Sequence, residues 1–557
     1  MSKYKTALAL SLLLVVTVVL CVVVYKRLKC PQGTYGKAAV AADSETCSEI
    51  GRDILQQGGS AVDAAIAALL CTSVINPQSS GIGGGAIFTV MDSSGNVKII
   101  NSRETVPANV TYTVLDSNSK PCSNTRGNKW IGVPGEIRGY EAAHKLYGKL
   151  PWATLFQPTI KLAREGIKIP EVQGSSIPSI PNTDETRALW KLFSDKKGNL
   201  LKIGGTVKFE KLADTLEIIA NNGADSFYSG KIAEDLVHDV QQAGGILTLQ
   251  DLAMYKVNVT DAWTVPLGEY QMYIPPPPAG GAVLSLVLNI LKGYQMYSAP
   301  ESSDEKTRFY HLYAEAFKFA NRLKKHIRDP NIVSENIENI FTEDSFASKI
   351  RAKIKTNITL IDYNIPLNTT DPQTDDDPSR SPVSGGTTHV SVLAEDGSAV
   401  SVTSSINRVF GSKIYSSQTG VILNNQLKDF CGRVNNISPG ERPPSSMAPS
   451  VLKSKSKTLV IGASGGSFIT TGIASTLINH LWFKKSLKEA IDDPVIFVDP
   501  EDKVIFEPKW DKIVNQHLIG WGHKITRFYN AVNAVEKDCG CIYAVSDTRK
   551  NGKAAGY

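Results

Sequence analysis

A short glycine–threonine segment holds the residue types best suited to chemistry. Gly385 and Gly386 precede Thr387, which opens a stretch of alternating side chains. The approach to these glycines, residues 366–386, is rich in Asp, Pro and Thr, as expected for an exposed connection. If the Gly386–Thr387 bond were cut, Thr387 would carry a free amine beside its own hydroxyl, and such an amine is a base that activates the hydroxyl as a nucleophile. The alternative is an ordinary loop that ends where a strand begins.

The residues after Thr387 predict a β-hairpin. Two alternating runs flank an Asp-Gly pair, at residues 389–393 and 399–403. Asp-Gly between alternating runs is a strong hairpin signal. A turn centred on this pair places Thr387 opposite Ile406, with Ser405 and Asn407 on either side and therefore close to Thr387. His389 lies on the same strand, and we interpret it as structural because an N-terminal threonine supplies its own base.

Further segments carry groups suited to binding a substrate. Arg103 follows a predicted strand, where its guanidinium could clamp a carboxylate through two hydrogen bonds; a solvated surface charge is the alternative. Residues 459–466 run from a strand through Gly465 and Gly466 into a helix predicted to begin near Ile469. Successive glycines at a helix start expose N–H groups that suit an anion or a developing oxyanion. Polar loops occur at residues 424–429 and 443–447.

Composition limits the class of protein. The 557 residues are 42% hydrophobic and 20% charged, which is typical of a globular chain of one large or several small domains. A net charge of +6 without a concentrated basic run beyond the N-terminus argues against nucleic-acid binding. Helical patterns dominate residues 134–252 and β patterns follow Thr387, so we place the main boundary at the end of residues 366–386.

The N-terminus predicts a membrane anchor. Residues 7–24 contain no charge, and 18 residues in a helix span roughly 27 Å, just enough for a bilayer core. A cleaved signal peptide is the alternative, but the apolar run continues into Tyr25-Lys26-Arg27 without a small-residue cleavage site. We therefore predict a cytosolic tail at residues 1–6 and an uncleaved transmembrane signal-anchor at residues 7–25.

Two signals disagree on the orientation of this anchor. Lys26, Arg27 and Lys29 follow the span while Lys3 and Lys5 precede it, which slightly favours a cytosolic C-terminus. Five glycosylation acceptor triplets, the last weakened by Pro439, favour the opposite orientation. Their asparagines are Asn109, Asn258, Asn357, Asn368 and Asn436. We follow the acceptors and predict a single-pass type II protein of the plasma membrane with an extracellular body.

The cysteines predict a disulfide rather than a metal site. Cys47 and Cys71 bracket a helical hairpin whose second helix starts at a capping box formed by Ser60 and Asp63. Antiparallel helices bring the start of one beside the end of the next, so a disulfide can close there; two buried thiols are the alternative, less suited to an oxidising compartment. The Cys-Gly-Cys at 539–541 is too closely spaced for a good metal pair, and we expect neither a metal nor a cofactor.

Taken together, these segments resemble the gamma-glutamyltransferase (glutathione hydrolase) family of N-terminal-nucleophile hydrolases, over essentially the whole chain after the anchor. The motifs that carry the resemblance are residues 101–104 (NSRE), 385–389 (GGTTH), 395–401 (EDGSAVS) and 444–447 (PSSM). Residues 275–281, 441–444 and 554–557 are most similar to the vertebrate branch that hydrolyses glutathione conjugates such as leukotriene C4.

The resemblance implies an α+β fold, a four-layer αββα sandwich, made as one chain and then self-cleaved at Gly386–Thr387. A large fragment, residues 30–386, would pair with a small catalytic fragment, residues 387–557, as a heterodimer. Thr387 would attack the γ-glutamyl amide of glutathione or of its conjugates, with Gly465 and Gly466 as the oxyanion hole. The γ-glutamyl ester would then pass to water, an amino acid or a dipeptide.

The resemblance also assigns the substrate's head group. The α-carboxylate would be held by Arg103, Ser445 and Ser446, with Gly466 also contacting substrate; the α-amine would be held by Asn407, Gln426 and Asp429. Ser405, a threonine in the mammalian type enzyme, would support the nucleophile. Gln426 replaces a glutamate of that enzyme, as in bacterial relatives, and predicts weaker γ-glutamyl binding than a Gln426→Glu variant.

Two other functions fit parts of the sequence. A catalytically silent surface glycoprotein of this fold would serve as a binding module, but Thr387 and the glycines around it are all present. Another amidase of the fold, such as a cephalosporin acylase, would not need the Arg103 and Ser445-Ser446 set, which suits an amino-acid head group.

Overall fold

The computed structural model describes most of the chain. The described residues are 30–110, 127–296, 298–332, 337–355, 360, 363, 385–431, 437–499, 502–507, 524–525 and 530–557. The predicted anchor at residues 7–25 and the glycosylation candidates Asn357, Asn368 and Asn436 lie outside them. No helix in these described ranges is both long and apolar enough to cross a bilayer.

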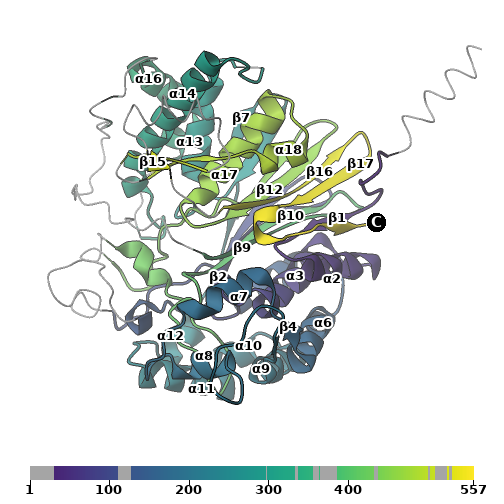
Figure 1. Ribbon diagram of the computed structural model, residues 1–557, viewed down its shortest axis with the longest axis vertical. Helices are drawn as coiled ribbons and strands as arrows, with labels where there is room; N and C mark the ends of the chain where they lie inside the picture. The colour runs from purple at the N-terminus through teal and green to yellow at the C-terminus, as the bar shows by residue number, and fades with distance from the viewer. Residues whose placement is uncertain are drawn as a thin grey trace, which may run out of the picture.

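Two antiparallel sheets form the centre of the molecule (Figure 1). The first contains, in spatial order, β18 (Ala555–Gly556), β1 (Ala39–Ala41), β9 (Gly386–Leu393), β10 (Ala399–Asn407), β2 (Gly85–Met91), β3 (Val97–Asn101) and β6 (Asn258–Asp261). The second contains β17 (Cys541–Ser546), β16 (Ala531–Asp538), β12 (Thr458–Ser464), β11 (Ser450–Lys453), β8 (Tyr270–Ile274) and β7 (Trp263–Leu267). Both sheets therefore contain strands from before and after Thr387.

Helices cover the outer face of each sheet (Figure 1). Below the first sheet lie α2 (Glu45–Gln56), α3 (Ala61–Ile75), α5 (Glu136–Tyr147), α6 (Trp152–Glu165), α7 (Glu171–Ser176), α8 (Arg187–Leu192), α9 (Glu210–Asn222), α10 (Asp225–Tyr228), α11 (Lys231–Gln242) and α12 (Leu249–Met254). Above the second lie α13 (Gly281–Lys292), α14 (Ser303–Leu323), α15 (Glu338–Thr342), α16 (Asp344–Lys353), α17 (Phe468–Leu477) and α18 (Leu487–Asp492). The predicted αββα sandwich is confirmed.

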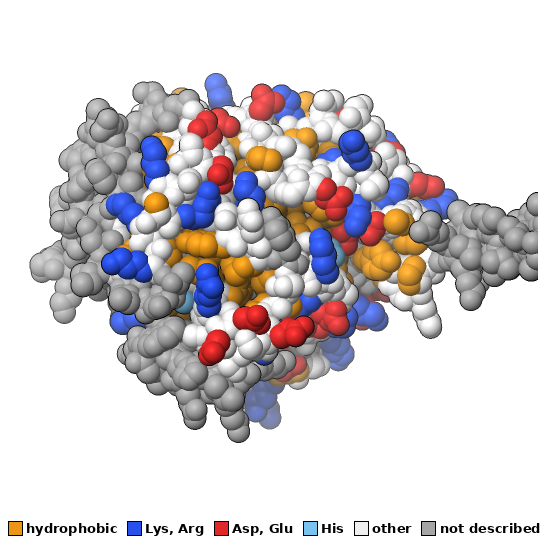
Figure 2. Space-filling model, turned by 90° about the horizontal axis from the view of Figure 1, so that it is seen from above, with side chains coloured by type: hydrophobic (Ala, Val, Ile, Leu, Met, Phe, Trp, Pro, Cys, Tyr) orange, Lys and Arg blue, Asp and Glu red, His pale blue; other side chains and the backbone are white. Residues whose placement is uncertain are grey.

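Short strands complete the fold outside the two main sheets. β4 (Ile167–Lys168) pairs with β5 (Thr206–Val207), and β13 (Ile496–Val498), β14 (Val504–Phe506) and β15 (Lys524–Ile525) form a small sheet of their own. Viewed from above, the outer face of the molecule carries interspersed Lys, Arg, Asp and Glu side chains with hydrophobic side chains between them (Figure 2). Charges of the two signs are thus mixed on this face.

One helix in each layer, α3 and α13, is largely apolar on all sides because it is covered on all sides. Every residue of α3 except Ile75 is buried, as is every residue of α13 from Gly281 to Leu291. A helix that is hydrophobic all round is expected where neighbours surround it. These two helices therefore anchor the two apolar cores that hold the sheets between them.

The hairpin of β9 and β10 forms as predicted, but its register differs by one residue. Gly397 has φ +84° and its N–H donates to Ala394 O (3.1 Å), while the Ala394 N–H donates to Ser398 O (2.9 Å). This is a turn followed by a left-handed glycine in a bulge, a common longer alternative to the two-residue turn. The extra residue sets Thr387 opposite Ser405, so the predicted pairing of Thr387 with Ile406 was wrong.

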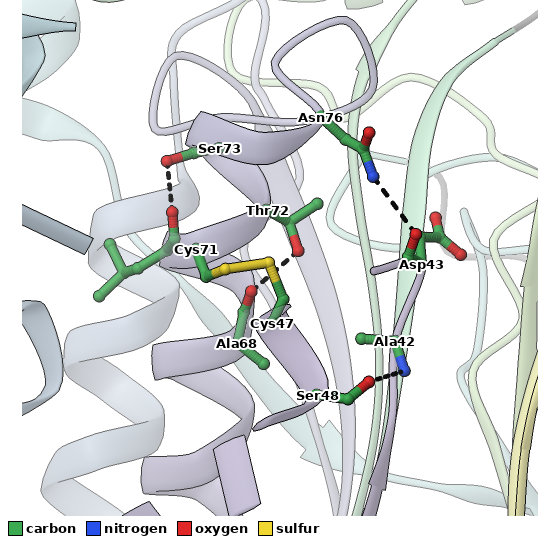
Figure 3. Close-up of a disulfide and its surroundings, with 10 residues drawn as sticks. Ala42, Asp43, Cys47, Ser48, Ala68, Cys71, Thr72, Ser73 and Asn76 are labelled. Atoms are coloured by element: carbon green, nitrogen blue, oxygen red, sulfur yellow. Dashed lines mark hydrogen bonds between the residues drawn. A yellow bond between two sulfur atoms is a disulfide. The ribbon is translucent and has the colours of Figure 1, made fainter. Parts of the chain in front are cut away.

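The predicted disulfide between Cys47 and Cys71 is confirmed, with Cα atoms 5.4 Å apart (Figure 3). The capping box at the start of α3 is also present, since Ser60 Oγ accepts from the Asp63 N–H. Ser48 Oγ accepts from the Ala42 N–H (3.0 Å), which ties α2 to the chain just after β1 (Figure 3). The helical hairpin thereby fixes the segment that leads to Asp43.

A second disulfide joins Cys30 to Cys541, with Cα atoms 5.4 Å apart. This disulfide was not predicted from the sequence, where Cys541 stands out only as part of the Cys-Gly-Cys at 539–541. The two cysteines are 511 residues apart in the sequence, and no local pattern links positions at that separation.

The two sheets approach closely where Gly462 on β12 faces His389 on β9. A Cβ atom added at Gly462 would lie 2.2 Å from Cε1 of the His389 ring, which is fully buried. We expect Gly462→Ala to lower the free energy of unfolding by about 1–3 kcal/mol through overpacking. Guanidinium-induced unfolding measures this loss. Gly36→Ala is the matched control, because no heavy atom lies within 4 Å of the added Cβ, and an equal effect in both variants would contradict the assigned contact.

Candidate functional site

The hydroxyls of Thr387 and Ser405 form the centre of the site. Thr387 is only 3% exposed, and its Oγ1 lies 3.1 Å from Ser405 Oγ. Ser405 Oγ donates to the carbonyl oxygen of Gly386 (2.8 Å) and accepts from the Asn407 N–H (2.9 Å). Because the single Ser405 hydroxyl proton points at Gly386, the Thr387 hydroxyl is the donor to Ser405. The Ser405 hydroxyl therefore polarises the carbonyl of the Gly386–Thr387 bond.

A buried ion pair supports Thr387 from the other side. Lys550 Nζ donates to Thr387 O and to Asp43 Oδ2, each at 2.7 Å. Asp43 also accepts from Thr388 Oγ1 (2.8 Å) and from Asn533 Nδ2 (2.8 Å). Asp43 and Lys550 are 2% and 3% exposed. Sequence reasoning missed these residues, because nothing in the local sequence marks two positions so far apart as partners.

His389 lies next to the site but is held by its own sheet. Its Nδ1 is 2.9 Å from Thr403 Oγ1 and its Nε2 is 3.0 Å from Ser391 Oγ. Since Ser391 donates its proton to Asn533 O, Nε2 donates to Ser391 and Nδ1 accepts from Thr403. Burial, with the nearby Lys550 ammonium, lowers the pKa of His389 to about 3. The ring is therefore neutral, in agreement with the structural interpretation.

Arg103 lies just after β3, is 1% exposed, and is hydrogen-bonded through Nε and Nη2. Its Nε donates to Pro443 O (2.8 Å), and its Nη2 donates to Pro444 O (2.9 Å) and to Asp429 Oδ2 (2.6 Å). Of the residues predicted to bind the two charged groups of a substrate, Arg103 and Asp429 thus pair with each other. A zwitterionic head group would meet one partner of each sign here.

The other predicted amine ligands surround the same carboxylate. Asn407 Nδ2 donates to Asp429 Oδ1 (3.1 Å) and Gln426 Nε2 to Asp429 Oδ2 (2.8 Å). Gln426 is 1% exposed, and its Oε1 has no hydrogen-bond partner among the described residues. A buried acceptor of this kind carries a desolvation cost of about 1–3 kcal/mol. A donor such as an ammonium group would satisfy it.

The predicted serines, Ser445 and Ser446, follow the two prolines that contact Arg103 and are half-buried. The backbone carbonyls of Pro443 and Pro444 hold Arg103 just before them. Ser445 Oγ accepts from the Met447 N–H (3.0 Å), and Lys324 Nζ lies 3.4 Å from Ser446 Oγ. Arg103 and the serine pair are therefore brought together as predicted, with Lys324 as a further cation that the sequence analysis did not identify.

The predicted oxyanion glycines, Gly465 and Gly466, follow β12, which packs against β9 and β10. Ser401 Oγ donates to Ile461 O, and the His389 ring lies on Gly462. In the hairpin of β9 and β10, Ser401 pairs with Ser391, Thr403 with His389 and Ser405 with Thr387. β12 ends at Ser464, directly before Gly465 and Gly466. Both have positive φ, +120° and +62°, a conformation that glycine adopts without strain.

The carboxyl group of Glu104, the residue after Arg103, is buried. Glu104 is fully buried, and neither of its oxygens has a hydrogen-bond partner among the described residues. Burial raises the pKa of Glu104 to about 8, although the adjacent Arg103 guanidinium opposes the shift. Burial also raises the pKa of Glu136, to about 7. Protonated Glu104 leaves Asp429 as the carboxylate bonded to Arg103.

Comparison with known proteins defines first the fold and then the family. The fold matches that of a cephalosporin acylase from Bacillus halodurans, with TM-score 0.82 and 24% identity over 95% of this chain and 97% of that one. It also matches the gamma-glutamyltranspeptidase of Helicobacter pylori, with TM-score 0.54 and 28% identity over 60% of this chain and 95% of that one. The architecture is that of N-terminal-nucleophile hydrolases.

The family follows from the sequence. The family model described as Gamma-glutamyltranspeptidase matches residues 47–557. The glutathione hydrolase 5 proenzyme of Rattus norvegicus is 42% identical over 578 residues, which cover 99% of this chain and 98% of that protein. The chain therefore belongs to the gamma-glutamyltranspeptidase family, as the resemblance predicted.

The raised pKa of Glu104 predicts a pH-dependent stability difference. Between pH 4.5 and 8 the unfolded chain releases the Glu104 proton while the folded chain retains it, so stability from this group falls as pH rises and levels off above pH 8. Glu104→Gln removes this loss. We expect the variant to gain up to about 1.4 kcal/mol per pH unit on wild type across the window, measured by guanidinium-induced unfolding. A constant difference from pH 5 to pH 8, as expected for the exposed control Glu165→Gln, would contradict the shift.

Proposed function

We propose that the chain is a self-processing γ-glutamyl hydrolase and transpeptidase that acts on glutathione and its S-conjugates. The observation that carries this proposal is the hydrogen-bonded arrangement of Thr387, Ser405 and the Gly386 carbonyl. It supplies a nucleophile, a proton acceptor and a polarised carbonyl at the bond whose cleavage would create an N-terminal threonine. Membership of the family, with its glutathione hydrolase relatives, supports the substrate class.

Self-cleavage follows from these bonds. Thr387 Oγ1 attacks the Gly386 carbonyl carbon as its proton passes to Ser405 Oγ, and Ser405 delivers its own proton toward the Gly386 oxygen. Lys550 and Asp43 hold the Thr387 backbone in place. The proton on the Gly386 oxygen then passes to the Thr387 nitrogen as the C–N bond breaks, which leaves an ester on Thr387 Oγ1 and a free amine on Thr387. Water then hydrolyses the ester and releases Gly386 as a carboxylate.

The mature site uses the same hydroxyl on a γ-glutamyl amide. The Thr387 amine, with a pKa near 7.7–8.0 for an unperturbed α-amino group, accepts the hydroxyl proton at neutral pH. The N–H groups of Gly465 and Gly466 stabilise the oxyanion of the tetrahedral intermediate. The amine returns the proton to the leaving nitrogen, and a γ-glutamyl ester remains on Thr387. Water, an amino acid or a dipeptide then takes the γ-glutamyl group.

The head group of the substrate exchanges with an existing ion pair. In the structure Arg103 and Asp429 neutralise each other. The α-carboxylate would bind Arg103 and the hydroxyls of Ser445 and Ser446, while the α-ammonium would bind Asp429, Asn407 and the open Gln426 Oε1. The buried Arg103 charge therefore keeps a partner whether the site is empty or filled, which avoids the cost of an unpaired buried ion.

The cellular setting remains part of the proposal. Residues 7–25 would anchor the protein as a type II plasma-membrane protein with an extracellular body. Asn109 is exposed in a turn and Asn258 lies on the edge strand β6, positions that suit glycan attachment. Two disulfides are consistent with an oxidising compartment.

Variants of the two hydroxyls test self-cleavage. Thr387→Ala should remain a single full-length band on a reducing gel and release no glutamate from glutathione. Ser405→Ala should slow self-cleavage about 10²–10³-fold, the usual loss for one oxyanion donor. Ser405→Thr retains the hydroxyl and should process at nearly the wild-type rate. Wild-type protein that stays intact, or normal processing in Ser405→Ala, would contradict the mechanism.

Gln426→Glu tests the head-group site. A carboxylate at this position, beside Asp429, should attract the α-ammonium more strongly and lower the KM for γ-glutamyl-p-nitroanilide several-fold, with a smaller change in kcat. Gln57→Glu introduces the same charge at an exposed position and serves as the control. An equal or higher KM in Gln426→Glu, measured at one pH, would remove Gln426 from the amine site.

A further inference from the structure

The Cys30–Cys541 disulfide joins residues on opposite sides of the proposed cleavage site. Cys30 lies at the start of the large fragment, and Cys541 opens β17 in the small fragment. Their Cα separation of 5.4 Å lies within the range that an unstrained disulfide requires. The other disulfide seen in full, Cys47–Cys71, lies entirely within the large fragment.

The bond lies in an ordered contact between the two ends of the chain. Tyr35 and Ile542 exchange two backbone hydrogen bonds, each 2.9 Å long. The carbonyl oxygen of Tyr557 accepts from the N–H groups of Gly36 (3.1 Å) and Lys37 (2.7 Å). The backbone that follows each cysteine is therefore hydrogen-bonded, at Tyr35 after Cys30 and at Ile542 after Cys541, and these bonds set the positions of the two cysteines. Cys541 is only 6% exposed, so solvent reductants have limited access to its sulfur.

We propose that self-cleavage yields a heterodimer whose two fragments are covalently linked through Cys30–Cys541. This inference rests on the proposed self-cleavage at Gly386–Thr387. The disulfide forms when the two thiols lose two protons and pass two electrons to an oxidised protein disulfide of the secretory pathway, which is reduced to a dithiol. The small catalytic fragment is then bonded to the segment that directly follows the membrane anchor.

The Cys30–Cys541 link also supports the position of the proposed nucleophile, Thr387. From Cys30 the chain runs through β1 to Asp43, which bonds to Lys550 and Thr388. β1 pairs with β9 on one side and with β18 on the other. The disulfide therefore holds β1 in register. Asp43, the counterion of Lys550, follows the end of this strand. Loss of the link should loosen the support of Thr387 as well as the attachment of the fragment.

Peptide mapping of the wild-type full chain, produced in a secretory host and purified in detergent, tests the link directly. The protein is alkylated before any reduction and digested with trypsin. We expect residues 30–37 to be recovered as a disulfide-linked species with residues 538–549, and fragmentation to place the bond on Cys541 rather than Cys539. Recovery of residues 30–37 with an alkylated thiol, or bonded elsewhere, would overturn the proposal.

Gel electrophoresis distinguishes the proposed Cys30–Cys541 link from the proposed self-cleavage on which it rests. On a reducing gel the wild type should give two bands, and on a non-reducing gel one band of full mass. A single band under reducing conditions would contradict self-cleavage, whereas two bands under both conditions would contradict only the covalent link. Cys431 is also disulfide-bonded, so a Cys431→Ser/Cys541→Ser variant should release the small fragment without reductant. Cys47→Ser, whose bond lies within the large fragment, should not.

Discussion

The buried ion pair between Asp43 and Lys550 is the interaction on which the rest of the site depends. It joins the first strand of the described chain to the last turn before its C-terminus, and Lys550 completes it with a bond to the carbonyl of Thr387. Removal of one partner from a buried pair is costly, typically about 3–5 kcal/mol, because the other charge remains without compensation. The geometry of the nucleophile is therefore coupled to the closure of the whole first sheet.

The charged and polar groups of the proposed head-group site are likewise paired with one another. Arg103, Asp429, Asn407 and Gln426 form one connected set, and the set is nearly satisfied without substrate. The open Gln426 oxygen and the protonated Glu104 are the exceptions. Under the proposed function, a site arranged in this way would bind an ammonium and a carboxylate together better than either alone, and would select an amino-acid head group over a simple acid or amine.

Local patterns predicted much of this arrangement, and long-range packing accounts for the rest. The Asp-Gly turn predicted the hairpin that brings Ser405 to Thr387, and the capping box predicted the hairpin that Cys47 and Cys71 close. The predicted register was wrong by one residue, because the sequence of the turn does not distinguish a two-residue turn from a turn followed by a bulge at Gly397. The partners of Arg103 and the pairing of Asp43 with Lys550 depend on how distant segments pack, and no spacing in the sequence encodes that.

The place of β1 in the first sheet would affect how long the two proposed fragments stay together after cleavage. This strand belongs to the proposed large fragment, yet it lies between β9 and β18, both of which belong to the small one. The second sheet is likewise shared, since β7 and β8 come from before residue 387 and the other four strands from after it. Neither fragment has a complete sheet of its own. Dissociation of the proposed fragments, once any disulfide between them is reduced, would leave both sheets incomplete with open edges. The fragments would then part only as fast as the sandwich unfolds, so their non-covalent association would be a matter of kinetic stability rather than of binding affinity.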